Sequence, residues 1–510
     1  MTATSGELRF WVDMALECVR RDHTPSISAG DQRGPFLTAR ALGLALAAIH
    51  DAKMIAQGTP VAVLVSGPPV PLGLPGLAGN SVIVAAAAAG FQTLLLRYPR
   101  QTGLLNTAWT EWLQLFNLGA IGSVAEAAGR AYGLGVHGLG LLDLYHGRRG
   151  AYSPSSPPEP YQHTAPPNEP GQGYAGGAWG EEVTPLVAPR PAFPPPPGRI
   201  SPTVVDDTQH YRDDFAKVAD LGFDDRSRGR TAEQELIGIY WGYDGPPELG
   251  TPPRLYMQVV LGILDDIDAR RLNALSVDEE LAVVAACAVA MADAGIHAWF
   301  YKYSPDHMMW RPIVGIRSAE PGNGTAEPGW FPLGRPDTNQ SGTNPSQIRL
   351  AGTGLTPDFP AYPSGHATFG AAAFHVLRLF LVEKKQATFR PNGTDNIDFD
   401  FVSDEYNGRN IDPRPNDSGG KDPRPLVTRR YASLWKAIVD NSISRVYIGV
   451  HWEFDGITKR NSADNGDEFG VPLSPSELGH TGGVWLGGQI ANVVAAGIGV
   501  SAPTITAGRM

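Results

Sequence analysis

Residues 359–370 combine a tight turn with the start of a helix, and their chemistry suits the binding of an anion. In this stretch a proline, a serine able to cap a helix and a glycine come before a run of small helix-forming residues. The free N–H groups and the dipole of a helix N-terminus both favour negative charge, and glycine lets a ligand approach the backbone. We therefore predict that Ser364 and Gly365 cradle an oxyanion, with His366 beside it in the first helical turn.

Two other stretches bring cations and a second imidazole. One offers Lys302 and Arg311, and the other offers Arg445, His451 and Asp455. A buried oxyanion needs several charge-assisted donors to offset its lost hydration, and the planar fork of arginine suits that task. Because His451 and Asp455 are four residues apart, a helix would place them on one face, where the carboxylate could hold one ring nitrogen. Each stretch alone is typical of a solvated surface, but together they predict an oxyanion site.

The order of the three stretches resembles the signature of the superfamily of vanadium-dependent haloperoxidases and type 2 phosphatidic acid phosphatases. That signature is KxxxxxxRP, then PSGH, then SRxxxxxHxxxD, and its second and third parts match in full. The first part departs, because eight residues rather than six separate Lys302 from Arg311. The preceding residues, Asp293 to Trp299, look like the haloperoxidase stretch that leads to the lysine. We therefore place a two-residue insertion between Lys302 and Arg311.

The sequence resembles the fungal vanadium chloroperoxidases in particular, and this likeness extends over most of the chain. We find no likeness in residues 151–202 and 461–479. The resemblance implies an all-helical fold of two four-helix bundles, with the active site in the second bundle.

The resemblance also implies a role for each residue of the site. Vanadate would be the cofactor, with a ring nitrogen of His451 as its one protein ligand. His366 would accept a proton from hydrogen peroxide, and Lys302 would polarise the bound peroxide. In the surroundings, Asp455 would orient His451, and Asp244 would pair with the second arginine of the site. The vanadate-binding residues implied in this way are Lys302, Arg311, Ser364, Gly365, His366, Arg445 and His451.

Two aromatic residues bear on the choice of halide. Trp299 and Phe359 match the aromatic residues that line the halide site of the chloroperoxidases, whereas bromoperoxidases tend to carry histidine at the second position. The alternative is that both are ordinary core aromatics. The expected reaction is the oxidation of chloride and bromide by hydrogen peroxide to hypohalous acid, which would halogenate a small organic substrate.

Two other functions fit the same residues. In an acid phosphatase, His451 would be the nucleophile that forms a phospho-histidine, and His366 would protonate the leaving group. The protein could also be a non-catalytic oxyanion-binding protein. The two cases differ in whether His366 is needed for turnover but not for anion affinity. The length of the chain, the pair Trp299 and Phe359, and the helical N-terminal region favour the haloperoxidase.

The elements that must position this site are predicted to be helices in two bundle-like halves. We expect residues 1–150 to form the N-terminal half, residues 151–202 to be a Pro-rich connector or surface excursion, and residues 203–510 to form the C-terminal half with the site. The GxGxxG match at 133–138 follows no strand, so it predicts glycines near helix ends rather than a dinucleotide site. Loops are expected at 304–358 and 391–425. Helices are predicted at 7–22, 35–56, 80–98, 107–129, 133–145, from 211, and at 231–243, 253–269, 277–303, 361–385, 428–443 and 481–496.

Composition excludes several classes of protein. The formal net charge of -11 argues against nucleic acid as a partner, and Cys18 and Cys287, the two cysteines of the chain, are too few for a disulfide framework or a Cys-rich metal site. The longest apolar run, 82–90, is too short to span a bilayer, and the first residues lack the pattern of a secretory signal. We expect a soluble protein without a membrane partner, either cytoplasmic or exported by a non-classical route.

Overall fold

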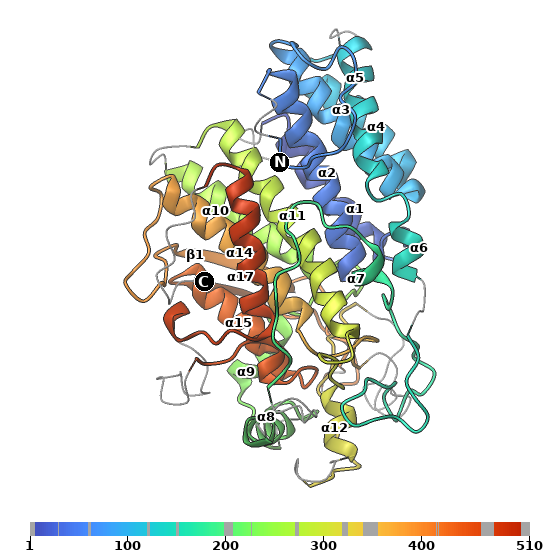
Figure 1. Cartoon of the computed structure of the whole chain (residues 1–510), viewed down its shortest axis with the longest axis vertical. Helices are drawn as coiled ribbons and strands as arrows, with labels where there is room; N and C mark the ends of the chain where they lie inside the picture. Colours follow the sequence, from blue (N-terminus) through green and yellow to red (C-terminus); the bar gives the residue numbers. More distant parts are fainter. Residues whose placement is uncertain are drawn as a thin grey trace.

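The computed structural model consists mostly of helices, many of which run along the long axis of the molecule (Figure 1). It describes residues 6–500 except 29, 60–62, 120–122, 149–151, 198–207, 226, 271–274, 319–324, 340–354, 415, 417 and 461–473. The helices of the described residues are α1 (Arg9–Asp22), α2 (Pro35–Ala56), α3 (Asn80–Arg97), η2 (Pro99–Gln101), α4 (Thr102–Leu115), α5 (Ser123–Gly138), α6 (Asp143–Arg148), α7 (Trp179–Glu182), α8 (Thr208–Leu221), α9 (Ala232–Tyr240), α10 (Pro252–Arg270), α11 (Val277–Tyr303), α12 (Pro312–Ser318), α14 (Gly365–Glu383), α15 (Leu434–Tyr447), α16 (Glu453–Gly456), η3 (Pro475–Glu477) and α17 (Gly482–Gly497).

Close packing explains the glycines of α5. A Cβ atom at Gly129 would lie 2.1 Å from the carbonyl oxygen of Ala85, and one at Gly133 would lie 2.3 Å from that of Ala89. Only glycine therefore lets α5 approach α3 this closely. Our prediction of separate helices at 107–129 and 133–145 was wrong. The glycines lie inside α5, and one helix ends at Leu115 before the next begins at Ser123. The rejection of a dinucleotide site in this stretch agrees with its helical structure.

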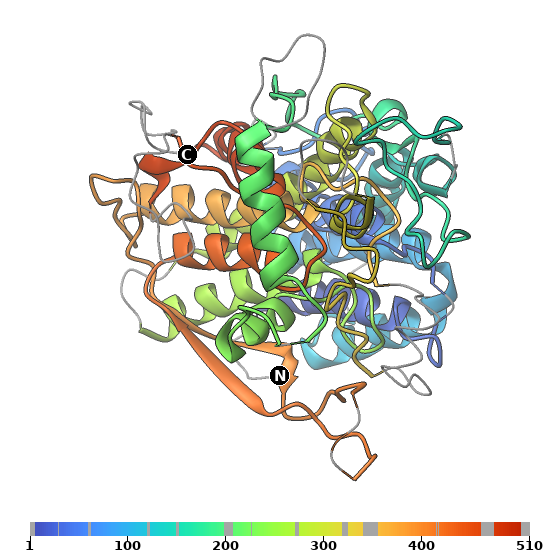
Figure 2. The same ribbon diagram turned by 90° about the horizontal axis from the view of Figure 1, so that it is seen from below.

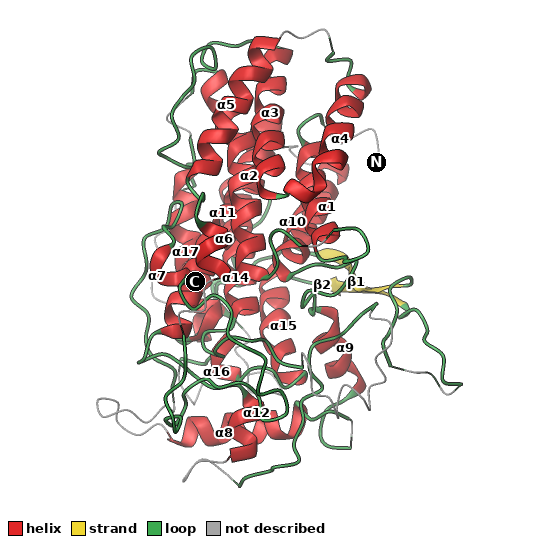
Figure 3. Ribbon diagram, turned by 90° about the vertical axis from the view of Figure 1, so that its right-hand side faces the viewer, coloured by secondary structure: helices red, strands yellow, loops and turns green. Residues whose placement is uncertain are grey.

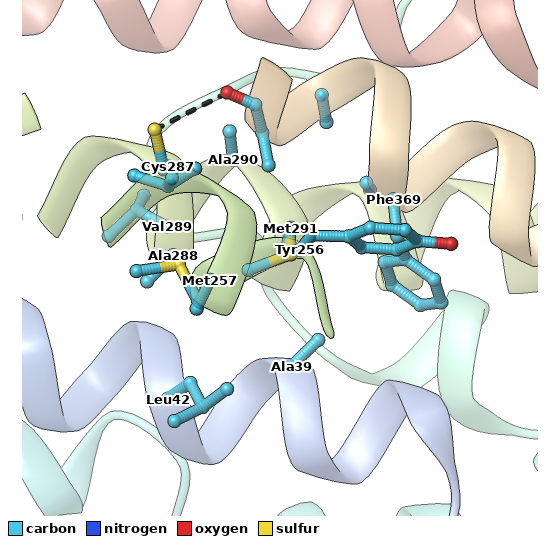
Figure 4. Packing of buried hydrophobic residues seen from close by; sticks show 14 of the residues in the cluster. Ala39, Leu42, Tyr256, Met257, Cys287, Ala288, Val289, Ala290, Met291 and Phe369 are labelled. Atoms are coloured by element: carbon cyan, nitrogen blue, oxygen red, sulfur yellow. Dashed lines mark hydrogen bonds between the residues drawn. The ribbon is translucent and has the colours of Figure 1, made fainter. Parts of the chain in front are cut away.

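Helix α11 lies at the centre of the molecule and packs against α2 on one side and against α14 and α17 on the other. Its start is fixed by a capping box, in which the Ser276 hydroxyl accepts from the backbone N–H of Glu279 and the Glu279 side chain accepts in return. Figure 4 shows buried side chains of α2, α10, α11 and α14 meeting in one cluster, with Leu42 and Phe369 among them. The N-terminal and C-terminal helices thus share a hydrophobic core.

A β-hairpin interrupts the helical pattern. Strands β1 (Phe399–Asn407) and β2 (Leu426–Tyr431) pair antiparallel, with Phe399 opposite Tyr431, and they lie beside α9 and α15 at the edge of the molecule (Figure 3). The predicted loop at 391–425 and the predicted helix start at 428 were wrong. Buried and partly exposed residues alternate along β1, but the polar residues around it obscured that period. The prediction of a mainly helical fold is confirmed, with the hairpin as its exception.

The Pro-rich segment is packed against the protein rather than excluded from it. Its described residues, 152–197, are called the strap below; residues 198–202 lie outside the described residues. The carboxylate of Asp293 on α11 accepts the backbone N–H groups of Leu186, Val187 and Ala188 at 2.6 to 2.9 Å. The strap therefore runs along α11 toward the site, and its assignment as a connector or a surface excursion stays a prediction.

Helices α8 and α12 close the lower end of the molecule. Seen from below, α8 crosses the other helices (Figure 2). Its Asp214 carboxylate accepts the backbone N–H of Phe454 in α16 at 2.8 Å. This contact fixes α16, which carries one of the predicted site residues.

By length and composition, three helices of the described chain could cross a membrane, namely α3, α11 and α14. Our search for uninterrupted apolar runs did not find them. Within the protein, 94% of the apolar window is buried for α11 and α14, and 67% for α3. Their apolar composition is accounted for by packing against other helices.

Candidate active site

The start of α14 is built as the sequence predicts. Ser364 is its N-cap, with the hydroxyl accepting from the backbone N–H of Ala367 at 3.4 Å, and Gly365 begins the helix. The backbone N–H of Ser364 donates to the carbonyl of Asp455 at 2.7 Å, which joins this turn to α16. The N–H groups at the start of a helix have no partner within the helix, so they can face an anion.

Lys302 lies beneath the turn that leads into α14. Its side chain is fully buried, and Nζ donates to the carbonyl oxygens of Pro360, Ala361 and Pro363 at 2.8, 3.0 and 2.6 Å. All three N–H bonds of the ammonium group are therefore used by the turn. Burial and the neighbouring Arg311 lower the pKa of Lys302 well below its usual range. The structure thus shows Lys302 supporting this turn, while its contact with peroxide stays a prediction.

Arg311 presents a buried donor without an acceptor. Its Nε donates to the carbonyl of Phe359 at 2.9 Å, while Nη1 donates to the carbonyl of Val450 at 2.8 Å and to Nε2 of His451 at 3.0 Å. Within the described part of the chain, Nη2 has no hydrogen-bond partner, although the side chain is buried. A buried guanidinium N–H without an acceptor is costly, so a bound oxygen ligand would stabilise this arrangement.

The hydrogen bonds of His451 determine which ring nitrogen carries the proton. Because arginine can only donate, Nε2 of His451 accepts from Arg311 and is unprotonated. Nδ1 therefore carries the hydrogen and donates to Oδ2 of Asp455 at 2.8 Å. The same Oδ2 accepts the backbone N–H of Trp452 at 2.9 Å. Burial and the charges of Arg311 and Lys302 lower the pKa of His451 well below its usual range, which keeps the ring neutral.

The contact between His451 and Asp455 forms for a reason that differs from the prediction. We expected the pair to share a helix face, but His451 precedes α16. Trp452 is the N-cap of α16, and Asp455 reaches back from its first turn to cap the backbone and hold the imidazole. A capping turn therefore brings the two side chains together, over the same spacing of four residues.

Arg445 and Asp244 form the buried ion pair that the resemblance implies. Nη1 of Arg445 donates to Oδ2 of Asp244 at 2.9 Å, and Nη2 donates to the carbonyl of Gly238 at 3.1 Å. Burial raises the pKa of the Asp244 carboxyl, but Arg445, His366 and Arg335 together outweigh it and lower the pKa overall. The pair places a fixed positive group at the edge of the site.

His366 is neutral, and its Nδ1 has no hydrogen-bond partner among the residues that the structure describes. Its Nε2 donates to the carbonyl of Gly242 at 2.8 Å, and burial, together with Arg445, lowers its pKa to about 3. In a neutral ring with a proton on Nε2, Nδ1 is the acceptor. His366 can therefore take a proton from a ligand through Nδ1.

Trp299 and Phe359 form an aromatic wall under two cations. Their ring centres are 4.6 Å apart, and the ring of Phe36 lies 4.8 Å from that of Trp299. Nζ of Lys302 lies 5.3 Å from the Trp299 ring centre and 5.1 Å from that of Phe359. The guanidinium carbon of Arg311 lies 5.0 Å from the Phe359 ring centre. Such a wall can take up a poorly hydrated anion next to positive charge.

The strap completes this wall. The carbonyl of Ala175 accepts from Nε1 of Trp299 at 3.4 Å and from the hydroxyl of Tyr303 at 2.7 Å. Gly176 has a φ of 74°, and a Cβ atom there would lie 2.6 Å from Trp299 and 3.0 Å from Phe36. A residue other than glycine would therefore be strained and would displace the tryptophan.

These groups lie around a cavity of about 490 Å³ that reaches into both halves of the chain. The cavity is lined by Gly365, His366, Arg445 and His451 from the predicted site and by the two predicted aromatic residues. Ser364, Lys302 and Arg311 lie behind this lining and support it. The structure thus brings the predicted residues together, with Lys302 and Arg311 as the layer below.

The residues present fit a tetrahedral or trigonal oxyanion. The fit rests on the orphaned Nη2 of Arg311, the unprotonated Nε2 of His451 beside it and the helix start at Gly365. Arg311 and Arg445 bring two guanidinium groups to the site, and Arg445 is paired with Asp244. An anion with several oxygen atoms would satisfy these donors together.

Sequence reasoning missed several residues that shape the site. Phe36, Ala175 and Gly176 gave no local signal, because they act through packing and backbone groups. His163 of the strap is buried, and neither of its ring nitrogens has a hydrogen-bond partner among the described residues. Burial, with the charges of Arg311 and Lys302, lowers the pKa of His163 well below its usual range. A histidine in a proline-rich stretch could have been noticed, but nothing indicated where it lies.

Comparison with known proteins finds a matching family model, a relative in sequence and similar solved structures. Residues 282–471 match the family model described as the VCPO second helical-bundle domain. The chain is 32% identical to the vanadium chloroperoxidase of Curvularia inaequalis over 516 aligned residues. This alignment covers 89% of this chain and 79% of that protein. A bacterial vanadium-dependent iodoperoxidase shares the fold with a TM-score of 0.59 and 19% identity, over 97% of each chain. The holo form of a bacterial vanadium-dependent chloroperoxidase has a TM-score of 0.54 and 14% identity, over 91% of this chain and 92% of that chain.

Proposed function

The chain belongs to the vanadium haloperoxidase family, and from this premise we propose that it oxidises chloride and bromide with hydrogen peroxide to hypohalous acid. Membership of the family makes the protein a halide-oxidising peroxidase with vanadate as its cofactor. The choice of halide is our own inference, because proteins named for iodide and for chloride share this fold. The hypohalous acid would halogenate a small organic substrate.

The observation that carries the proposal is the state of His451. Its Nδ1 is fixed by Asp455, and its unprotonated Nε2 accepts from Nη1 of Arg311, whose Nη2 has no partner among the described residues. A neutral imidazole with one nitrogen held by a carboxylate is the form that ligates a metal centre. We therefore take His451 as the protein ligand of vanadate.

The other residues would hold the oxygen atoms of vanadate. Arg311 and Arg445 supply positive charge, and Ser364 and the backbone of Gly365 supply donors at the helix start. When bound, vanadate acts as a Lewis acid that activates hydrogen peroxide toward halide without changing its own oxidation state. Lys302 would contribute its charge and keep the turn of residues 359–364 in place.

Two further steps belong to residues of the cavity wall. His366 would accept a proton from hydrogen peroxide through Nδ1, since Nε2 is held by Gly242. Trp299 and Phe359 would take up the halide and remove part of its hydration, which makes it a better nucleophile. A phenylalanine rather than a histidine at position 359 supports competence with chloride as well as bromide.

Substitution of the two histidines tests these roles. His451→Ala should lose vanadate binding and halogenation together. His366→Ala should keep much of the vanadate affinity and lose turnover by about a hundredfold or more, as expected for a positioned acid-base group. Calorimetric titration with orthovanadate and a bromination assay measure the two effects. The exposed His480 outside the cavity provides the control, His480→Ala.

The roles would be wrong under two outcomes. If His366→Ala kept full turnover, His366 would not be the proton acceptor. If His451→Ala bound vanadate as tightly as the unmodified protein, another residue would be the ligand.

A further inference from the structure

The outer part of the cavity carries two arginines, and neither forms an ion pair with a residue that the structure describes. Arg33, in the loop before α2, and Arg148, at the end of α6, both line the cavity and are exposed, whereas the groups of the inner part are buried. The packing of α6 against α2 and α7 brings these segments to one rim. In the inner part, Arg445 is paired with Asp244.

Arg33 makes no hydrogen bond or ion pair with any residue that the structure describes. The carboxylate of Asp22 lies within electrostatic range, but its oxygens accept the backbone N–H groups of Asp31 and Gln32 at 2.6 and 2.7 Å. This carboxylate therefore fixes the loop that carries Arg33 and leaves the guanidinium group open. The loop itself is held in place by these bonds.

Arg148 makes one hydrogen bond with the described residues, and the carboxylate of Asp31 lies within electrostatic range of it. Its Nη2 donates to the carbonyl of Asp31 at 3.2 Å, and it forms no ion pair within the described ranges. The Asp31 carboxylate is engaged with Arg100, whose backbone N–H donates to it at 3.1 Å. Arg148 is therefore oriented by the backbone while its remaining N–H groups stay available.

Apolar residues lie between the two arginines and the inner site. Pro35, Phe36 and Leu37 at the start of α2, and Pro252 at the start of α10, line the same cavity. Its volume of about 490 Å³ far exceeds that of a halide ion and falls in the range of about 300–1,000 Å³ usual for small-molecule sites. The cavity thus combines room for an organic body with unpaired positive charge at its rim.

We propose that the organic substrate is an anion, an activated aromatic or enolic compound whose carboxylate is bound by Arg33 and Arg148 while its apolar body lies against Pro35, Phe36 and Leu37. This geometry points the reactive end of the molecule toward the inner site. Arginine suits the task because its planar fork matches a carboxylate. The proposal rests on the proposed function only in taking this ligand for the acceptor that is halogenated. Halide is the competing occupant, and the experiment separates the two.

A matched pair of probes tests the proposal, para-hydroxyphenylacetate and its neutral amide, para-hydroxyphenylacetamide. Both are titrated calorimetrically into the full-length protein with excess orthovanadate, so that the inner site is filled. The variants are Arg33→Gln, Arg148→Gln and the pair together. The control is Arg409→Gln, which removes an exposed arginine outside the cavity. The same proteins are then assayed for bromination of each probe.

We expect the unmodified protein to prefer the carboxylate, each single variant to bind it about tenfold more weakly, and the double variant about a hundredfold more weakly, the loss expected for two charge-assisted hydrogen bonds. The ratio of kcat/KM for the carboxylate to that for the amide should fall by a similar factor. Equal binding of the two probes to the unmodified protein would overturn the proposal, as would an equal loss in Arg409→Gln. A raised KM for bromide with the amide, without a change in the probe ratio, would assign the arginines to halide instead. Carboxylate binding without any bromination would support this site and contradict the proposed function.

Discussion

Replacing Lys302 with methionine distinguishes the support role seen in the structure from a direct role in the reaction. Methionine keeps most of the side-chain volume but removes the three hydrogen bonds from Nζ to the turn before α14. If Lys302 holds this turn, Lys302→Met should destabilise the protein even without vanadate. If it acts only on the bound peroxide, stability should not change.

The magnitude follows from the contacts. Three buried carbonyl groups left without a donor cost about 1–3 kcal/mol each, whereas removing a buried ammonium group returns several kcal/mol of desolvation energy, so the net loss is roughly 2–5 kcal/mol. An unfolding entropy of about 2.1 cal/mol/K per residue gives about 1 kcal/mol/K for this chain. The melting temperature of the vanadate-free protein should therefore fall by about 2–5 °C.

Scanning calorimetry of the vanadate-free protein and titration with orthovanadate measure the two consequences. Displacement of the turn should also weaken vanadate binding by about tenfold or more, because supporting residues of a metal site have effects of that size. Lys385→Met, at an exposed lysine after the end of α14, controls for the loss of one charge. Unchanged melting temperature and unchanged vanadate affinity, with turnover alone reduced, would refute the support role.

Three other predictions concern the cavity wall and pH. Phe359→His should raise the preference for bromide over chloride, and an unchanged ratio of the two kcat/KM values would count against Phe359 in the halide pocket. Gly176→Ala should shift the same ratio and destabilise the protein by roughly 2–4 kcal/mol, since its Cβ would overlap Trp299 in a left-handed conformation; normal stability and selectivity would show that the strap does not shape the pocket. The pKa of His366 is lowered to about 3 in the folded protein. As the pH falls below about 6.5, the histidine is therefore protonated in the unfolded chain but not in the folded one, and stability is lost. His366→Gln should therefore lose less stability than the unmodified protein between about pH 6.5 and 4, on the order of 3 kcal/mol, and parallel pH curves would contradict the assignment.

The helices that sequence analysis located best carry explicit boundary signals. Pro35 begins α2, and the capping box of Ser276 begins α11, so both were predicted at their observed bounds. The break between α4 and α5 has no such signal, and glycines inside α5 were taken for helix ends. They are instead required by the approach of α3, a tertiary contact that a local pattern does not contain. The division into two halves at residues 150 and 202 stays a prediction.

The candidate site shows the same division between composition and geometry. The stretches that carry His366 and His451 were recognised because their residue types and spacing are themselves the signal. The sequence did not show where the side chain of Lys302 points. Its orientation depends on the path of the chain from residue 303 to residue 311 and on the carbonyl groups of another segment, such as that of Pro360. The contributions of Ala175 and Gly176 come from a backbone carbonyl and from the absence of a side chain, which no chemical pattern in the sequence marks.

The central claim is that this cradle uses vanadate for halide oxidation rather than binding phosphate for hydrolysis. One purified sample, stripped with chelator at low pH, is divided into a part reconstituted with orthovanadate and a part left bare. Each is assayed with hydrogen peroxide and bromide or chloride for halogenation of an activated 1,3-diketone, and for hydrolysis of an aryl phosphate. The account predicts halogenation with both halides in the reconstituted part alone. Phosphate hydrolysis by the bare part, inhibited by vanadate and without halogenation in either part, would contradict it.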